Sequence, residues 1–144
     1  MYGPGLGLRI MIAMAEEQLI KAFVAPARQE RYLSLLASAK GREKFLARLA
    51  HHMAKELNPD CAQSINGSAK EIETLLKAKG APDTCYVVSE NSKIDGKEMK
   101  LLEALEEVVG YGMGTFVSCV PGTISYFEGE DKGQRYILER KKAA

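Results

Sequence analysis

The segment 110–130 constrains the fold of this chain most, because it places a tight-turn signal between two apolar runs. Pro121 presets the backbone angle at the second position of a turn. Gly122 tolerates the positive φ that the third position of a type II turn requires. The apolar runs on either side have the length and composition of short strands. We therefore predict a strand near 115–120, a type II turn, and a second strand near 123–128.

Apolar residues spaced three and four apart predict several helices before this segment. Four helices are expected in the N-terminal half and a fifth directly before the glycine-rich stretch, at 14–25, 27–39, 42–57, 68–79 and 97–109. Ser68 and Glu71 form the S-x-x-E pattern of a capping box, and Asp95 with Glu98 suggests a second cap. The first half of the chain is therefore expected to be helical.

Two further strands complete the predicted sheet. The run TCYVVS at 84–89 is bounded by turn residues, and QRYILE at 134–139 follows a polar turn. Short turns between the last three strands indicate antiparallel pairing. The predicted order is α-α-α-α-β-α-β-β-β. This is an α+β fold in which the helical N-terminal half packs on a small antiparallel sheet of about four strands, with a single helical layer on one face.

The length of 144 residues predicts one domain with enough chain for a real core. Residues 1–13 are expected to be a flexible extension, because their glycines and Pro4 disfavour regular structure. The compact α+β domain is then 14–144. No apolar run approaches the roughly 18 residues of a membrane helix, so no membrane partner is predicted.

The chain has three cysteines, Cys61, Cys85 and Cys119, at wide spacings and without a CxxC motif. This pattern is typical of a reducing compartment and of thiols that serve as small apolar residues. A cytoplasmic location is therefore expected. The only histidines, His51 and His52, are adjacent and point about 100° apart on a helix, so they do not converge on one ion. No metal site and no cofactor is predicted.

Acidic residues are concentrated in the C-terminal half. The whole chain carries a net charge of +1, whereas residues 83–131 contain 3 basic and 10 acidic residues, a net of −7. The tightest acidic group is Glu128, Glu130 and Asp131, which we expect at an exposed hairpin turn. The leading hypothesis is a small regulatory or interaction module that binds another macromolecule, a protein, through this acidic surface.

Nucleic-acid binding is the second hypothesis. Lys44, Arg48, His51 and Lys55 follow one another at spacings of 4, 3 and 4, so they would share one face of the predicted helix 42–57. Such a face could contact the phosphates of a nucleic acid. A solvated face of an amphipathic helix is the plainer interpretation of the same pattern.

Catalysis is the third hypothesis, through a thiol or carboxylate site near Ser118, Cys119 and Glu128. No spacing in the sequence completes a catalytic set around them, so the chain is expected not to be an enzyme. The glycine-rich stretch 110–114 follows a predicted helix and precedes a strand, the reverse of the order in a dinucleotide-binding motif. We interpret it as a tight helix-to-strand connection.

Overall fold

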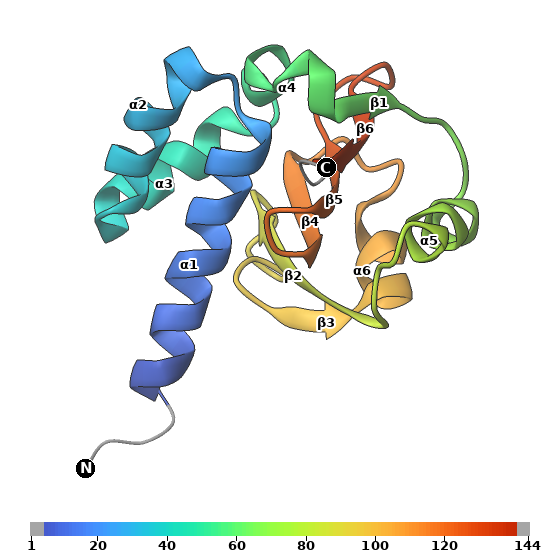
Figure 1. The fold of residues 1–144 in the computed structure, drawn as a ribbon, viewed down its shortest axis with the longest axis horizontal. Helices are drawn as coiled ribbons and strands as arrows, with labels where there is room; N and C mark the ends of the chain where they lie inside the picture. The colour runs from blue at the N-terminus through green and yellow to red at the C-terminus, as the bar shows by residue number, and fades with distance from the viewer. Residues whose placement is uncertain (1–4, 141–144) are drawn as a thin grey trace.

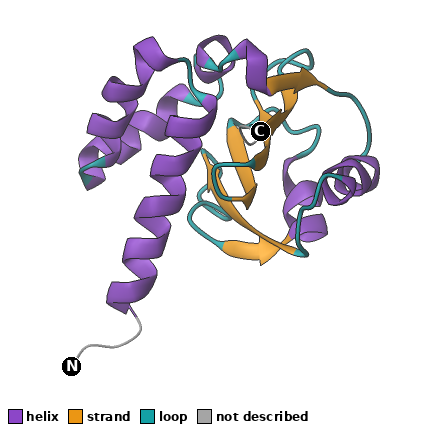
Figure 2. Cartoon of the chain, in the orientation of Figure 1, coloured by secondary structure: helices purple, strands orange, loops and turns teal. Residues whose placement is uncertain are grey.

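A six-stranded antiparallel sheet forms the centre of the computed structural model, which describes the backbone of residues 5–140 and the side chains of residues 14–140 (Figures 1 and 2). The strands lie in the order β1-β6-β5-β4-β2-β3. Their bounds are β1 Ala62–Ser64, β2 Thr84–Ser89, β3 Glu98–Lys100, β4 Thr115–Val120, β5 Ile124–Glu128 and β6 Arg135–Glu139. The α+β class and the antiparallel pairing of the last three strands are confirmed. The sheet has more strands than the four expected.

Helices cover both faces of this sheet (Figure 1). They are α1 Gly5–Phe23, α2 Pro26–Leu36, α3 Ala39–Arg48, α4 Met53–Glu56, α5 Ala69–Ala78 and α6 Leu101–Val108, with a short 3-10 helix at Pro59–Cys61. Helices α1 to α4 pack on one face, around Phe116 and Phe127, and α5 and α6 pack on the other, around Val117 and Tyr126. The expectation of a single helical layer is wrong, because strands buried on both faces, such as β4, need cover on each side.

The predicted turn between β4 and β5 is confirmed. The backbone N–H of Thr123 donates to the carbonyl of Val120 at 2.9 Å, which closes the turn around Pro121 and Gly122. Gly122 has a φ of +73°, as a type II turn requires. The capping box at the start of α5 is confirmed as well, since both of its reciprocal hydrogen bonds are present.

The predicted helix 42–57 is interrupted, which corrects the sequence interpretation. Helix α3 ends at Arg48 and α4 begins at Met53. The carbonyl of Ala50, which a continuous helix would use internally, accepts the backbone N–H of Glu130 at 2.9 Å. Gly114 also lies against this connection, where an added Cβ would come within 2.3 Å of the Ala50 nitrogen. Contacts from distant parts of the chain therefore break the helix.

Several helix ends differ from prediction, and the largest differences lie at the starts of α1 and α6. Helix α1 begins at Gly5. The expected flexible extension 1–13 stays a prediction, because residues 1–4 and the side chains of residues 5–13 lie outside the described part of the structure. Helix α6 begins at Leu101, because residues 98–100 pair with β2 as the edge strand β3.

An arginine between two carboxylates ties α1 and α3 to the sheet. Arg42 on α3 donates to Glu16 on α1 at 2.8 Å and to Asp95, in the loop after β2, at 2.7 Å. Tyr86 on β2 donates to Glu16 at 2.6 Å. The predicted role of Asp95 as a helix cap is wrong, since its carboxylate also accepts the backbone N–H of Ser89. Hydrogen bonds to Asp95 and Glu16 raise the pKa of Arg42, so the guanidinium stays charged and the cluster stays paired.

Candidate functional site

Glu128, at the end of β5, is fully buried, so the prediction that it lies at an exposed turn is wrong. Its carboxylate accepts hydrogen bonds from the hydroxyl of Tyr126 at 2.8 Å and from the backbone N–H groups of Gly110 at 3.1 Å and Gly112 at 2.9 Å. The Nε of Arg135 lies 3.4 Å away. A buried carboxylate is tolerated when donors surround it in this way. Burial and the Glu128 charge raise the pKa of Tyr126, which keeps its hydroxyl proton available as a donor.

The buried carboxylate fixes the conformation of the loop between α6 and β4. Gly110 and Gly112 have positive φ values of +93° and +67°, and each donates its N–H to Glu128. An added Cβ on Gly112 would lie only 2.8 Å from the carbonyl oxygen of Glu130, so the loop also packs on the following turn. The interpretation of 110–114 as a tight helix-to-strand connection is confirmed.

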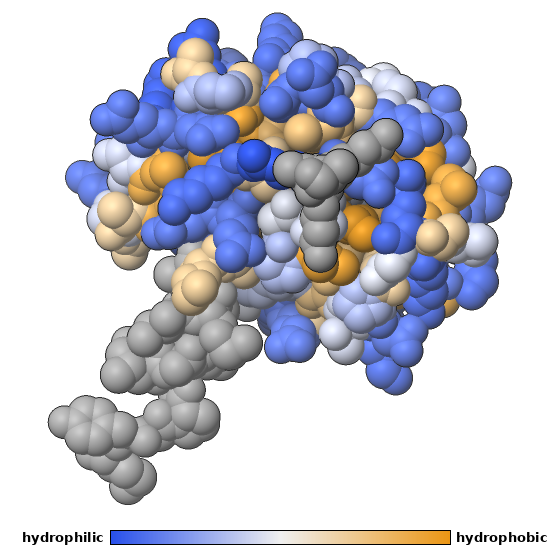
Figure 3. Space-filling view, in the orientation of Figure 1, coloured by the Kyte–Doolittle hydropathy of each residue, from blue (hydrophilic) through white to orange (hydrophobic). Residues whose placement is uncertain are grey.

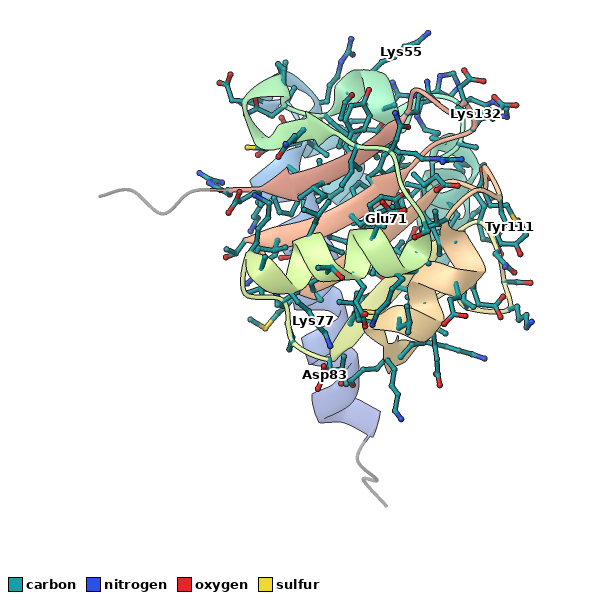
Figure 4. All side chains as sticks on the ribbon, turned by 90° about the vertical axis from the view of Figure 1, so that its right-hand side faces the viewer. Lys55, Glu71, Lys77, Asp83, Tyr111 and Lys132 are labelled. Carbon is teal, nitrogen blue, oxygen red and sulfur yellow. The ribbon has the colours of Figure 1, made fainter. Side chains whose placement is uncertain are left out.

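This loop displays two exposed apolar side chains, Tyr111 at 69% and Met113 at 39%. Within the part of the chain whose side chains are described, the other large exposed apolar residues are Met14 and Leu75, on different helices. Tyr111 and Lys132 both lie at the right-hand edge of the molecule in Figure 4. Figure 3 shows the opposite side of the molecule, which is mostly hydrophilic with apolar residues in small separate patches. Tyr111 and Met113 are two residues apart, so this one loop carries two of the four large exposed apolar side chains among residues 14–140.

A hollow of about 190 Å³ lies beside Tyr111. Its walls are the loop 110–112, the turn 129–132 and the residues Glu128 and Arg135. Glu130 and Asp131 are exposed, as predicted, and Lys132 next to them is exposed too. The hollow is therefore a small polar cavity, large enough for one side chain, with an aromatic ring at its rim.

The turn that carries the exposed acids is fixed to the connection between α3 and α4. The Nδ1 of His51 lies 2.6 Å from a carboxylate oxygen of Glu130, and both side chains are more than half exposed. Glu130 also donates its backbone N–H to the carbonyl of Ala50. The loop 110–114 and the turn at Glu130 therefore meet the same connection, and together they form one continuous surface.

The basic residues proposed for nucleic-acid binding do not form an unbroken stripe. Lys44 and Arg48 lie on α3, His51 in the connection, and Lys55 on α4. Arg48 lies 3.5 Å from Glu56 and donates to the hydroxyl of Tyr32 at 3.4 Å, and His51 contacts an acid. Two of these four side chains, Arg48 and His51, are thus engaged with acidic partners, which makes them less available for phosphate binding.

The residues proposed for catalysis are not brought together. Ser118 and Cys119 are buried neighbours at a bulge of β4 against β5, and of the two only Cys119 belongs to the core cluster under α5 and α6. Glu128 pairs with Thr115 at the other end of that strand. Burial raises the pKa of the Cys119 thiol, so little thiolate is present at neutral pH. Among the described residues, no group of three or more His, Cys, Asp or Glu is placed to hold a metal ion.

A second hollow of about 450 Å³ lies beside the edge strand β1. Cys61, Arg140 and an ion pair between Lys79 and Glu139, 2.9 Å apart, contribute to its lining. Burial raises the pKa of the Cys61 thiol, although the nearby Arg140 charge lowers it in part. Because Lys79 and Glu139 pair with one another, the hollow does not present one sign of charge that would attract a charged ligand.

Comparisons with protein-family models, with curated proteins and with solved structures each give no match to this chain. Within residues 5–140, no helix combines the length and the apolar character that crossing a membrane requires.

Proposed function

We propose that this chain is a small protein-binding module whose partner docks on the loop 110–114 and the turn 129–133, a surface centred on Tyr111 and Met113. The observation that carries the proposal is the exposure of Tyr111 on a loop held by a buried carboxylate. Tyrosine and methionine are enriched at protein interfaces, and tyrosine is among the residues that contribute most to binding energy. A cytoplasmic location stays a prediction.

The rigidity of the loop supports this proposal. Side chains that must be ordered on binding cost about 0.5–1.5 kcal/mol each, so a surface fixed before the encounter binds more tightly. Two glycine N–H groups bound to Glu128 and the contact between Gly112 and Glu130 supply that fixation here. Glu128 therefore acts in binding only by positioning the loop, whereas Glu130 and Asp131 can face a partner.

The charge of this region suggests the chemistry of the partner. Residues 83–131 carry a net of −7, and Glu130 and Asp131 are exposed beside Tyr111. We therefore propose a partner segment in which an apolar or aromatic residue contacts Tyr111. A neighbouring lysine or arginine would lie near the two acids. Opposite charge at the rim would speed association and make it sensitive to salt.

Photo-crosslinking tests the location of the surface directly. A photo-crosslinking amino acid in place of Tyr111 should capture a partner from extract, and the same amino acid in place of Leu75 should not. Leu75 is the control, because it is a large exposed apolar residue, at 44%, on α5. Mass spectrometry of the crosslinked peptide should find a basic residue close to the attachment point.

Variants then separate specific docking from adhesion. Tyr111→Ala and the double reversal Glu130→Lys with Asp131→Lys should each weaken the affinity for that crosslinked partner at least tenfold. Leu75→Ala and the reversal Glu30→Lys with Glu43→Lys, on exposed positions of α2 and α3, should leave it unchanged. Equal affinity for all five proteins would refute the proposed surface.

A further inference from the structure

Two of the three cysteines occupy neighbouring positions on adjacent central strands. In the register of β2 with β4, Tyr86 pairs with Ser118 and Val87 with Val117. One residue beyond Tyr86 on β2 is Cys85, and one residue beyond Ser118 on β4 is Cys119. Both lie within the bounds of their strands, and both belong to the core cluster under α5 and α6. Continued by one residue, this antiparallel register brings the two thiols next to one another, and their shared core cluster puts them on the same face, at the point where β4 has a bulge against β5 between Ser118 and Val120.

The type of pairing at this position is the closer of the two that antiparallel strands offer. Glu90 donates its backbone N–H to the carbonyl of Gly114 at 3.0 Å, so Glu90 and Gly114 form a hydrogen-bonded pair. From this pair along the two strands, non-hydrogen-bonded and hydrogen-bonded pairs alternate. The next pair, Ser89 and Thr115, is non-hydrogen-bonded, and the two side-chain oxygens are 2.7 Å apart. Continued one residue past the last pair, Tyr86 with Ser118, the same alternation gives the two cysteines a non-hydrogen-bonded position beside the bulge of β4. Cα atoms in such pairs are about 4.5 Å apart, at the short end of the range that disulfides span.

We propose that Cys85 and Cys119 are a redox-sensitive dithiol that a low-molecular-weight disulfide, such as oxidised glutathione, converts into a disulfide across β2 and β4. One thiol loses its proton and attacks a glutathione sulfur, which releases one reduced glutathione and leaves a mixed disulfide. The second cysteine, also deprotonated, attacks the protein sulfur and releases the second glutathione. The two cysteines lose two electrons and two protons in total, and the oxidant gains them as two thiols.

Burial sets the rate of this exchange. Burial raises the pKa of Cys85 to about 12, and the Cys119 pKa is raised by burial and then by the neighbouring Cys85. An effect of Cys85 on the pKa of Cys119 is expected only where the two thiols are close. Thiolate is the attacking species, so the folded protein should react slowly at neutral pH and faster as pH rises. The dithiol would therefore remain reduced through brief oxidation and respond to prolonged oxidation. This inference is independent of the proposed docking surface.

The test uses the unmodified chain. Folded protein is incubated with oxidised glutathione, remaining thiols are alkylated, and linked peptides are mapped by mass spectrometry. We expect one internal disulfide, between Cys85 and Cys119, with Cys61 recovered as the alkylated or glutathionylated residue. The same reaction in denaturant is the control, because the unfolded chain should give all three pairings.

A Cys61→Ser variant should form the same disulfide, and a Cys85→Ser variant should yield glutathione adducts without an internal link. The inference is overturned if the folded protein links Cys61 to another cysteine. It is equally overturned if the folded protein accumulates mixed disulfides only, or stays fully reduced after prolonged incubation with oxidised glutathione at alkaline pH, where it remains folded. These outcomes are read from the wild-type protein, so they hold even if a variant fails to fold.

Discussion

The carboxylate of Glu128 accepts a hydrogen bond of 2.9 Å from the backbone N–H of Gly112. In the sequence, Gly112 precedes the hairpin of β4 and β5, and Glu128 is its last residue. Through this contact and its counterpart at Gly110, a side chain at the end of β5 determines the shape of the loop before β4. The exposed Tyr111 lies between the two glycines. Its position therefore depends on a carboxylate that no partner can reach.

Replacement of that carboxylate should destabilise the fold. Glu128→Gln keeps the shape of the side chain but replaces one carboxylate oxygen by an amide N–H₂. This group faces the N–H and O–H donors that surround Glu128, so at least one buried donor loses its acceptor. We expect a loss of about 1–3 kcal/mol in the free energy of unfolding, measured by urea denaturation. Glu130→Gln is the matched control and should change stability by less than about 0.5 kcal/mol, because Glu130 is 52% exposed. Equal effects of the two changes would contradict the structural role assigned to Glu128.

A glycine in the β4–β5 turn should resist substitution. Gly122 has a φ of +73°, where a side chain costs about 1–2 kcal/mol, so Gly122→Ala should lower the free energy of unfolding by roughly that amount. Gly133→Ala serves as the control, since an added Cβ there meets nothing within 4 Å and its φ is not positive. Thermal or urea unfolding of both variants checks the difference. A neutral Gly122→Ala would argue against the type II turn.

Loss of the arginine between α1 and the sheet should cost more than loss of a surface charge. Arg42→Met leaves Glu16 and Asp95, with side chains 7% and 15% exposed, without their cation. Breaking a buried pair by removing one partner typically costs about 3–5 kcal/mol, and partial exposure of Arg42 should reduce this to about 2–3 kcal/mol. Lys44→Met, an exposed neighbour on α3, is the control for the loss of positive charge. Similar unfolding midpoints for both variants would show that the cluster contributes little.

Alkaline pH should destabilise the protein partly through Cys85. Its pKa is raised from 9.0 to about 12 by burial, so above pH 9 the unfolded chain loses this proton while the folded chain keeps it. Stability is then fully present below pH 9 and falls by up to about 1.4 kcal/mol per pH unit as pH rises between the two values. Urea midpoints from pH 8 to 10.5 should fall less steeply for Cys85→Ala than for wild type. Parallel curves would mean that the thiol ionises equally in both states.

Local signals in the sequence were sufficient for some elements. The capping box at Ser68 and the turn at Gly122 depend on residues within a few positions of one another, and both are confirmed. The break between α3 and α4 could not be predicted in this way. It arises because Ala50 binds the backbone of Glu130 and because Gly114 packs against it, and these contacts exist only in the folded chain.

The burial of Glu128 was predictable in part. Alternation along β5 places it on the same face as Tyr126, which is a core residue, so period-two reasoning assigns it inward. Its acidic neighbours favoured an exposed turn instead, and the donors that make burial tolerable come from a distant loop. The exposure of Tyr111 carried no local signal, because an aromatic residue between glycines fits a buried or an exposed loop equally well.

The shortness of strands β1 and β3 has a consequence for association. These two strands form the borders of the sheet, and each is only three residues long. A border strand offers its unpaired N–H and C=O groups as a template on which another chain can add a strand. Borders this short provide little template, so growth of the sheet from molecule to molecule is disfavoured, and contacts between copies would have to form through helices or loops.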